Sequence, residues 1–173
     1  MDILLDFLQI IVPAGLVLYA VFLIVRSFLN KQFQESNAKL KLEYNKTALP
    51  LRLQAYERMA IFLERITPNN LISRLNDGSY NVAQFQHILV NDIKQEFYHN
   101  LSQQIYMSDQ AWELTRQAME NTISMINSSA EFLEPEAPSI QLAKKIFEIV
   151  LSSEVNHINN ALTFLKDEIR TIF

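Results

Sequence analysis

The sequence predicts an all-α protein with an N-terminal transmembrane helix, an extended stalk and a cytoplasmic antiparallel helical bundle with a long C-terminal helix. Three observations predict this class. Only two glycines and five prolines occur in 173 residues, an apolar run opens the chain, and apolar residues recur at helical spacing afterwards. The expected division is an anchor over residues 1–27, a juxtamembrane stalk helix over 28–50 and a helical bundle over 51–173.

The first element is an apolar segment without a charged side chain over residues 7–25. Its 19 residues, which rise about 1.5 Å each, can cross a hydrocarbon core of about 30 Å, so we expect it to insert. A cleaved signal peptide is the alternative, but two acids and no base precede the segment, and no small-residue cleavage site follows it. Asp6 suits the positive end of the helix dipole, with a proton-relay role as its alternative.

Charged residues on the two sides of this segment predict its orientation. Two acids precede it, whereas the next charges are mostly basic: Arg26, Lys31, Lys39, Lys41, Lys46 and Arg52. The positive-inside rule then places the N-terminus outside the inner membrane and the C-terminal domain in the cytoplasm. Arg26, Lys31, Lys39 and Lys41 are also the candidate residues for contact with the membrane surface.

The stalk should continue as a helix up to Pro50, whose missing N–H predicts a kink or a short break there. The next helix carries an apolar stripe, which consists of Leu49, Leu53, Tyr56, Met59, Ala60, Phe62, Leu63 and Ile66. Thr67 and Pro68 are typical of a new helix start, and a turn at residues 76–78 ends that helix.

Two further helices are predicted around Ser108. The first covers residues 81–107, because apolar residues recur there every four positions, at Phe85, Leu89, Ile93, Phe97, Leu101 and Ile105. Ser108 should cap the second helix, whose apolar stripe consists of Trp112, Thr115, Met119, Ile123 and Ile126. The two helices meet by a sharp turn or a small kink, and residues 128–139, with two prolines, predict a loop.

The last predicted helix runs over residues 139–172. Its apolar residues alternate at steps of three and four, and they are Ile140, Ala143, Phe147, Leu151, Val155, Ile158, Leu162, Leu165, Ile169 and Ile172. This rhythm predicts one long packed helix, and a coiled-coil seam between copies of the chain is a hypothesis that it supports.

The composition argues against most kinds of active site. Without cysteine, the chain has no disulfide, thiolate nucleophile or zinc finger, and two glycines cannot build a phosphate-binding loop. Residues 53–173 hold nine basic and fifteen acidic side chains, whereas a nucleic-acid-binding protein presents a basic face. We therefore predict no enzyme, no catalytic residue, no cofactor, no nucleic-acid partner and no small-molecule substrate.

One pattern resembles a metal site. Glu96 with His99, and Glu154 with His157, each place a carboxylate and an imidazole one helical turn apart, as ferritin-like bundles do. Apolar stripe residues adjoin both pairs, so polar flanks of amphipathic helices are the preferred interpretation and a metal-binding bundle is the alternative.

The most distinctive patch lies between residues 96 and 112. Its candidate interaction residues are Tyr98, Gln103, Gln104, Tyr106 and Trp112. Tyrosine and tryptophan need hydrogen-bond partners when buried, so a buried polar network is the preferred interpretation of the patch. A partner-binding surface is the alternative.

An N-terminal anchor followed by LPLRLQAYERMAIFLERITPNNLI and EFYHNLSQQIYMSDQAW resembles a small uncharacterised membrane-anchored family of Bacteroidota bacteria. That resemblance implies no activity. The anchor and stalk are also similar to the b subunit of rotary ATP synthases, but the stalk of that family is uninterrupted, whereas prolines occur here at positions 50, 68, 135 and 138.

The combined prediction is a non-enzymatic, membrane-anchored scaffold or accessory subunit of an inner-membrane protein complex, which acts through its cytoplasmic helical domain. Its expected partners are the membrane and either further copies of itself or other proteins of the complex. A membrane-surface sensor is a third class.

Overall fold

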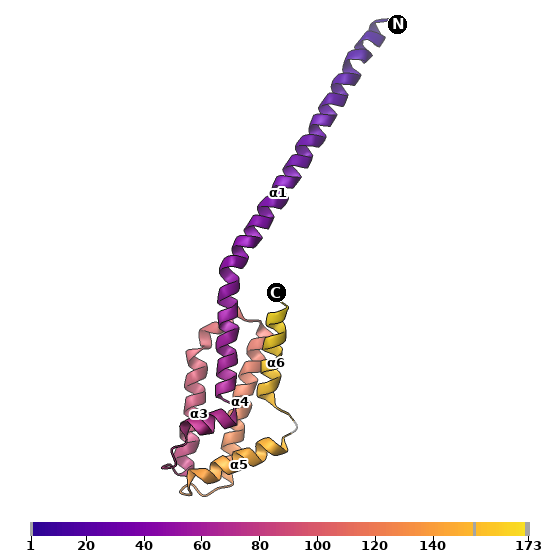
Figure 1. Ribbon diagram of the computed structural model, residues 1–173. Helices are drawn as coiled ribbons and strands as arrows, with labels where there is room; N and C mark the ends of the chain where they lie inside the picture. Colours follow the sequence, from indigo (N-terminus) through magenta and orange to yellow (C-terminus); the bar gives the residue numbers. More distant parts are fainter. Residues whose placement is uncertain (1, 154, 172–173) are drawn as a thin grey trace. The chain divides into compact units, whose positions relative to one another are not determined.

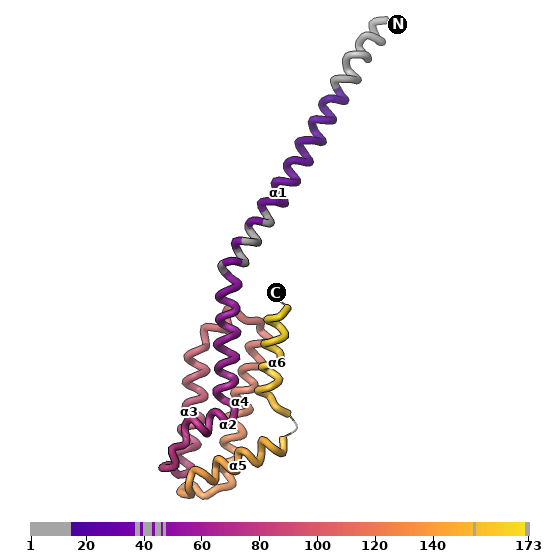
Figure 2. The backbone as a smooth tube through the Cα atoms, in the orientation of Figure 1, coloured from indigo at the N-terminus to yellow at the C-terminus, as the bar shows by residue number. Residues whose placement is uncertain are grey.

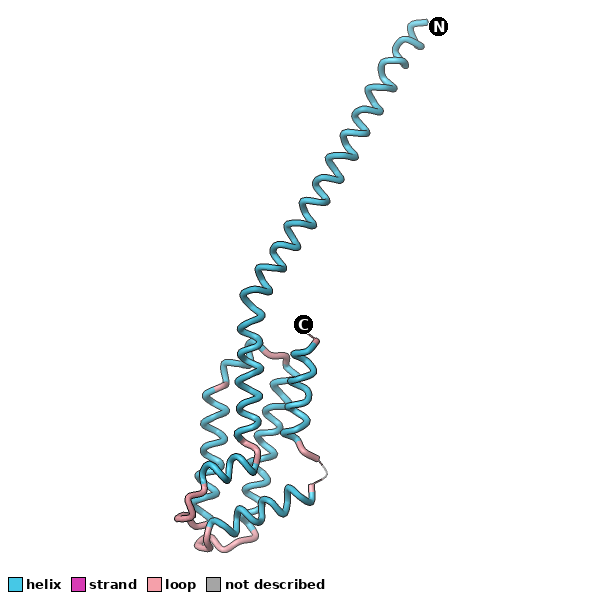
Figure 3. Tube along the Cα trace, in the orientation of Figure 1, coloured by secondary structure: helices cyan, strands magenta, loops and turns pink. Residues whose placement is uncertain are grey.

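The computed structural model is all-helical, as predicted (Figure 1). It describes the backbone of residues 2–153 and 155–171; within the first helix it describes the side chains of residues 15–36, 39, 43, 46 and 48–65 (Figure 2). In these residues the elements are α1 (Asp2–Arg65), α2 (Pro68–Leu75), α3 (Val82–His99), the 3₁₀ helix η1 (Leu101–Tyr106), α4 (Asp109–Glu131), α5 (Ser139–Ser152) and α6 (His157–Arg170). Figure 3 shows short loops between them and no strand in the described part.

The chain divides into two compact units, Met1–Leu49 and Pro50–Phe173. The first unit contains only the N-terminal part of α1, and the second contains the remaining turns of α1 and every later helix. The helix is continuous through Pro50, so of the two predicted alternatives the short break is wrong. After Pro50, one side of the helix is buried in a core. The free energy gained by this packing compensates for the one backbone hydrogen bond that is lost because proline has no N–H.

The core of the second unit is built around α4, which packs against α3, α5 and α6 (Figure 1). The buried face of α4 consists mainly of small residues, namely Ala111, Thr115, Ala118, Thr122, Ser129 and Ala130, with Ile126 as the large exception. Small side chains let neighbouring helices approach closely, and the larger side chains of those neighbours fill the space. Thr115 and Thr122 satisfy their buried hydroxyls by donating to the carbonyl oxygens four residues earlier, each at 2.8 Å.

The helices that surround α4 supply large apolar side chains. The last turns of α1 bury the predicted stripe around Met59, Phe62 and Leu63, and Ala55 is buried with them. Helix α2 begins at Pro68 as predicted and buries Leu71 and Ile72. Thr67 precedes α2 without a capping hydrogen bond from its side chain.

The loops also follow the sequence signals. Gly78 adopts a φ of 82°, a left-handed conformation that glycine takes without strain. The predicted loop before α5 is shorter than expected, because α4 continues to Glu131. Its backbone is fixed to the start of α3 by hydrogen bonds from Val82 N to Ala137 O at 2.8 Å and from Ser139 N to Tyr80 O at 3.0 Å.

The predicted helix over residues 81–107 ends early, at His99. The residue Asn100 closes α3, and its side-chain amide donates to Glu96 O at 2.9 Å. Leu101 and Ile105, which the four-residue spacing assigned to the buried face, are exposed on η1. Ser108 caps α4 as predicted by accepting a hydrogen bond from Ala111 N at 3.1 Å. Because α3 and α4 pack against each other, the connection is the sharp turn and not the small kink.

The predicted long C-terminal helix is wrong. Two helices of 14 residues, α5 and α6, occupy that range, and Asn156 starts the second by accepting a hydrogen bond from Asn159 N at 2.9 Å. The junction holds serine, valine and asparagine, which are weak helix formers. Of the proposed seam, Ile140, Leu151 and Val155 are exposed, while Ile172 lies outside the described residues. The seam is therefore not one continuous surface.

Candidate functional site

The N-terminal part of α1 contains one segment that is long and apolar enough to cross a membrane. It covers the 22 residues Gly15–Ser36, and none of it is buried within the protein. The core helix of a soluble protein can be equally long and apolar, but its residues are mostly buried, whereas those of this segment are exposed. A signal sequence near the N-terminus can also be equally long and apolar. The predicted span at residues 7–25 begins before the described side chains, as does Asp6.

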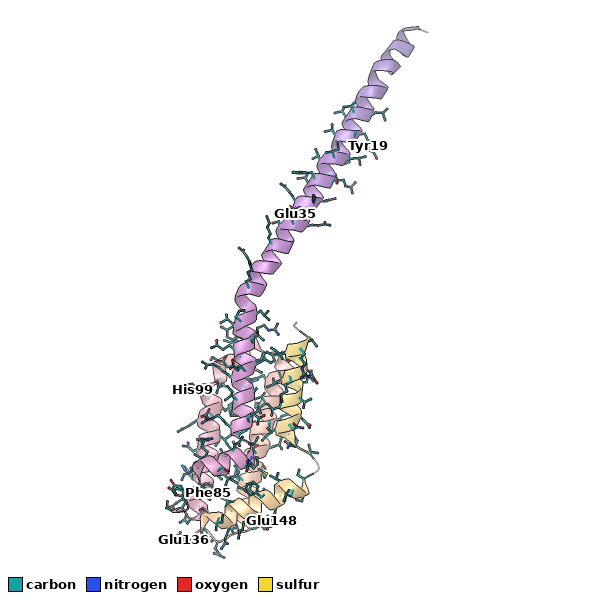
Figure 4. The ribbon with its side chains drawn as sticks, viewed as in Figure 1. Tyr19, Glu35, Phe85, His99, Glu136 and Glu148 are labelled. Atoms are coloured by element: carbon teal, nitrogen blue, oxygen red, sulfur yellow. The ribbon has the colours of Figure 1, made fainter. Side chains whose placement is uncertain are left out.

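The basic residues chosen as membrane-surface candidates lie on α1. Arg26 and Lys31 are exposed and fall within the apolar segment, and Lys39 is exposed three residues after it ends. The side chain of Lys41 lies outside the described residues. Figure 4 labels Tyr19 and Glu35, two further exposed residues of this part of α1.

A second exposed apolar region lies on the bundle, at the turn between α3 and α4. It consists of Tyr98, Leu101, Ile105 and Tyr106, which we call the η1 surface. Ile105 is 76% exposed and Tyr98 is 66% exposed. No charged residue occurs from Asn100 to Ser108. Three of the four large side chains lie on this uncharged segment, and Tyr98 lies two residues before it; exposed apolar side chains gathered in this way are typical of interaction sites.

The η1 surface rests on a fixed support. Below it, Met107 is buried, and Ser108 N donates to the Tyr56 hydroxyl at 3.3 Å. The Arg52 Nε donates to Tyr106 O at 3.3 Å, which joins η1 to α1. The exposed side chains are therefore held by contacts of the turn itself with the rest of the bundle.

Aromatic stacking continues from this support into the core. The ring of Phe97 lies 5.1 Å from the ring of Trp112 and 5.7 Å from that of Phe62, measured between centroids. Tyr98 meets Phe97 edge-on at 6.3 Å and projects outward. Trp112 thus belongs to the packing beneath the η1 surface, and Tyr98 belongs to the surface.

The candidate interaction residues are therefore divided between core and surface. Tyr98, Gln104 and Tyr106 are exposed, whereas Gln103 and Trp112 are half-buried. The described hydrogen bonds of the glutamines are local, because Gln104 donates to Leu101 O at 2.9 Å and Gln103 to Ser102 Oγ at 3.4 Å. Leu101 and Ile105 were missed in the sequence, although Asn100 is a helix-stop signal that would have placed them on a different segment.

A polar junction joins three helices at the base of this region. The Ser108 hydroxyl donates to Glu168 Oε2 at 2.8 Å, which fixes the end of α6 to the start of α4. Burial raises the pKa of the nearby Tyr56 hydroxyl, and the Glu168 carboxylate acts in the same direction. This junction is structural, since each member points to another element of the bundle.

The three described residues of the metal alternative, Glu96, His99 and His157, are not gathered at one place. Glu96 Oε1 forms an ion pair with Arg65 at 2.7 Å, and His99 is exposed near the end of α3 (Figure 4). His157 begins α6, and Glu154 lies outside the described residues. Among the described residues, no group of three or more histidine, aspartate or glutamate side chains is placed to hold a metal ion.

His157 instead lines a cleft of about 360 Å³ between α4 and the α5–α6 junction. The other polar residues of the cleft are hydroxyls and amides, which are Asn121, Thr122, Ser124, Ser128, Ser153 and Asn156. Several of them bond to the backbone of their own segment, as Ser128 does to Ser124 O at 2.9 Å and Ser153 to Val155 O at 3.0 Å. The described lining offers no pair of groups that could act as acid and base.

Comparisons with known proteins give one match. No curated protein and no solved structure matches the chain. The sequence profile of one protein family, described as Family of unknown function (DUF7935), matches residues 2–172. Because the match covers both the apolar segment and the whole bundle, the chain belongs to this family of unknown function.

Proposed function

We propose that this protein is a non-enzymatic, membrane-anchored scaffold or accessory subunit of an inner-membrane protein complex, which binds a partner protein through its helical bundle. The η1 surface carries this proposal. Its four exposed side chains include two tyrosines, and tyrosine is enriched in the residues that dominate binding energy at interfaces. The rest of the bundle surface carries many charged side chains, so this uncharged segment is the part best suited to exclude water against a partner.

The membrane anchor is the second part of the proposal. The apolar segment Gly15–Ser36 supports it by length and exposure, and the basic residues that follow support a cytoplasmic bundle with the N-terminus outside. We also propose, from the sequence resemblance given above, that the relatives are membrane-anchored proteins of Bacteroidota. A bundle held at the membrane surface is concentrated near other proteins of the same membrane, which favours weak contacts.

The test is co-purification of the full-length chain from native membranes in mild detergent. The variant Ile105→Glu places a charge in the η1 surface, and a buried unpaired charge opposes association strongly. The matched control is Phe132→Glu, because Phe132 is 73% exposed and follows α4, at the other end of that helix from η1. We expect partner proteins to co-purify with the native chain and with the control in similar amounts. The amount that co-purifies with Ile105→Glu should be at least tenfold lower.

Two outcomes would contradict the proposal. One is a native chain that purifies without stoichiometric partners, and the other is a set of partners that Ile105→Glu leaves unchanged. Both variants change exposed residues, so the thermal unfolding midpoint of each should stay close to that of the native chain. Trp112 is the only tryptophan and lies in the bundle, so its fluorescence measures this midpoint directly.

A further inference from the structure

A groove lies between the last turns of α1 and the short helix α2, which follows α1 after a short turn (Figure 2). Its volume is about 610 Å³. Glu57, Ile61 and Glu64 line the groove from α1, and Asn70 and Arg74 line it from α2. All of its lining residues belong to the second unit of the chain, so the groove is a feature of the bundle alone.

Hydrogen bonds at the turn hold the two walls of the groove in place. The carbonyl oxygen of Glu64 accepts hydrogen bonds from Thr67 Oγ1 and from Asn70 Nδ2, both at 2.8 Å. Ile66 and Leu71, on either side of the turn, are buried in the core. A partner therefore meets a surface that is already formed, and its binding does not carry the entropic cost of ordering that surface.

Both arginines of the groove are paired with acids of α3. Arg65 Nη2 donates to Glu96 Oε1 at 2.7 Å. The two Nη atoms of Arg74 donate to the two carboxylate oxygens of Asp92 at 2.9 and 2.6 Å. Charge-assisted pairs of this kind neutralise each guanidinium locally. The arginines therefore add no surplus positive charge that would attract an acidic partner.

The acids on the α1 wall have no such partner in the bundle. Glu57 and Glu64 are exposed, and the ion pairs among the described residues include neither of them. Arg58 is the only other charged residue between them in the sequence, and it does not line the groove. The charge that remains in the groove is therefore that of two carboxylates.

An apolar side chain separates these two carboxylates. Ile61 is 52% exposed, and it falls with Glu57 and Glu64 within about 60° of the helix circumference. The two glutamates are seven residues apart, which is about 10 Å along the helix axis. The groove thus presents an apolar centre with a negative charge at each end.

We propose that this groove binds an amphipathic helix of a partner protein, in which two basic residues stand seven positions apart and flank apolar residues. A helix that lies along α1 rises by the same 1.5 Å or so per residue, so its two basic residues face both glutamates at once. Its apolar residues then cover Ile61, as in other complexes that seat a helix in a groove. Opposite charges at the two ends fix the register of the helix and exclude acidic segments. The proposal concerns a different surface from the η1 surface, so each can hold without the other.

Two synthetic peptides test the proposal on the full-length chain in mild detergent. Each has about 20 residues, enough to form a helix, with leucines at positions 4 and 5 of a central block. The patterned peptide has lysines at positions 1 and 8 of this block. In the rearranged peptide the second lysine moves to position 6, about 140° around the helix from the first. Fluorescence anisotropy, with empty micelles as the blank, should show at least fivefold tighter binding of the patterned peptide, and added salt should weaken that binding.

Variants of the chain locate the binding. Glu57→Lys combined with Glu64→Lys should weaken binding of the patterned peptide at least tenfold, and Ile61→Gln should weaken it at least threefold. The matched control is Glu131→Lys combined with Glu134→Lys, which makes the same change in net charge at two exposed positions outside the groove. This control should keep the affinity within twofold of the native value.

Three outcomes would overturn the proposal. The first is a patterned peptide that binds no more tightly than the rearranged one, and the second is an equal loss of binding in the charge variant and its control. The third is a native chain that is dimeric in detergent and becomes monomeric with Glu57→Lys and Glu64→Lys, because a second copy would then occupy the groove. The Trp112 unfolding midpoint of every variant should stay close to the native value, since all the changed residues are exposed.

Discussion

Ser108 has two structural tasks that depend on one hydroxyl. Its oxygen accepts a hydrogen bond from Ala111 N at 3.1 Å and so caps α4, while its proton is donated to Glu168 at 2.8 Å. We expect Ser108→Ala to lower the free energy of unfolding by about 1–3 kcal/mol, because it removes the cap and leaves the Glu168 carboxylate without this donor. Urea unfolding followed by Trp112 fluorescence measures the change.

The control for Ser108→Ala is Ser102→Ala. Ser102 is exposed on η1 and its described hydrogen bond is a long one, accepted from Gln103 Nε2 at 3.4 Å. Its loss should leave the urea midpoint within error of the native value. Equal effects of the two substitutions would show that the junction of α1, α4 and α6 contributes little to stability.

Tyr56 should make the stability of the bundle depend on alkaline pH. Burial raises its pKa above the ordinary value, so the folded state holds the hydroxyl proton more tightly than the unfolded state does. Its contribution is therefore fully present below the unfolded pKa, about pH 10, and is lost as the pH rises through the higher folded pKa. Unfolding midpoints of the native chain should fall above that pH, and the fall should be smaller for Tyr56→Phe. Tyr98→Phe, which changes an exposed tyrosine, should keep the native pH dependence.

The extent of α3 shows where the sequence pattern is reliable and where it is not. Residues from Phe85 to Phe97 are buried as predicted, but a strict four-residue step advances about 40° around a helix each time. After four such steps Leu101 would face about 160° away from Phe85, so the pattern could not describe one buried face over its whole length. The structure resolves the conflict by ending α3 at His99 and starting a new segment.

Two isoleucines of this region allow a matched comparison. Ile93 is fully buried on α3, and Ile105 is the most exposed large residue of η1. Ile93→Ala should lower the free energy of unfolding by about 2–5 kcal/mol, because it leaves a cavity in the core. Ile105→Ala should change it by no more than about 0.5 kcal/mol, as exposed substitutions usually do. Trp112 fluorescence during urea unfolding gives both values, and similar losses would contradict the break at Asn100.

The C-terminal helices show how a periodic pattern can outweigh a local signal. Alternating steps of three and four run through residues 140–172, and from them one long helix was predicted. Ser152, Ser153 and Asn156 favour caps and turns, since their side chains compete for backbone hydrogen bonds. In the structure the cap at Asn156 prevails, because α6 then packs along α4 instead of extending away from it.

At the scale of the whole chain, the sequence predicted the helical class, an apolar segment in the N-terminal helix and the bundle, but only part of the candidate surface. Tyr98 and Tyr106 were chosen as interaction candidates because they are polar aromatic residues. Leu101 and Ile105 were assigned to the core because they are apolar and continue the four-residue spacing. An isoleucine on a surface has the same sequence signal as one in a core. Only the end of α3 decides between them, and that end depends on packing among helices that are distant in sequence.

The orientation of the anchored chain is the broadest prediction, and the chain offers a direct test. Leu151 is 86% exposed, so Leu151→Cys gives a single reactive thiol on the bundle of a protein that has no other cysteine. If basic residues after the apolar segment keep the bundle in the cytoplasm, a membrane-impermeant maleimide should label this thiol only after the inner membrane of spheroplasts is broken. Labelling in intact spheroplasts would mean that the bundle lies outside. Replacing Arg26 and Lys31 by glutamate in the same variant should increase labelling of intact spheroplasts, because it removes the first two positive charges after the predicted span at residues 7–25.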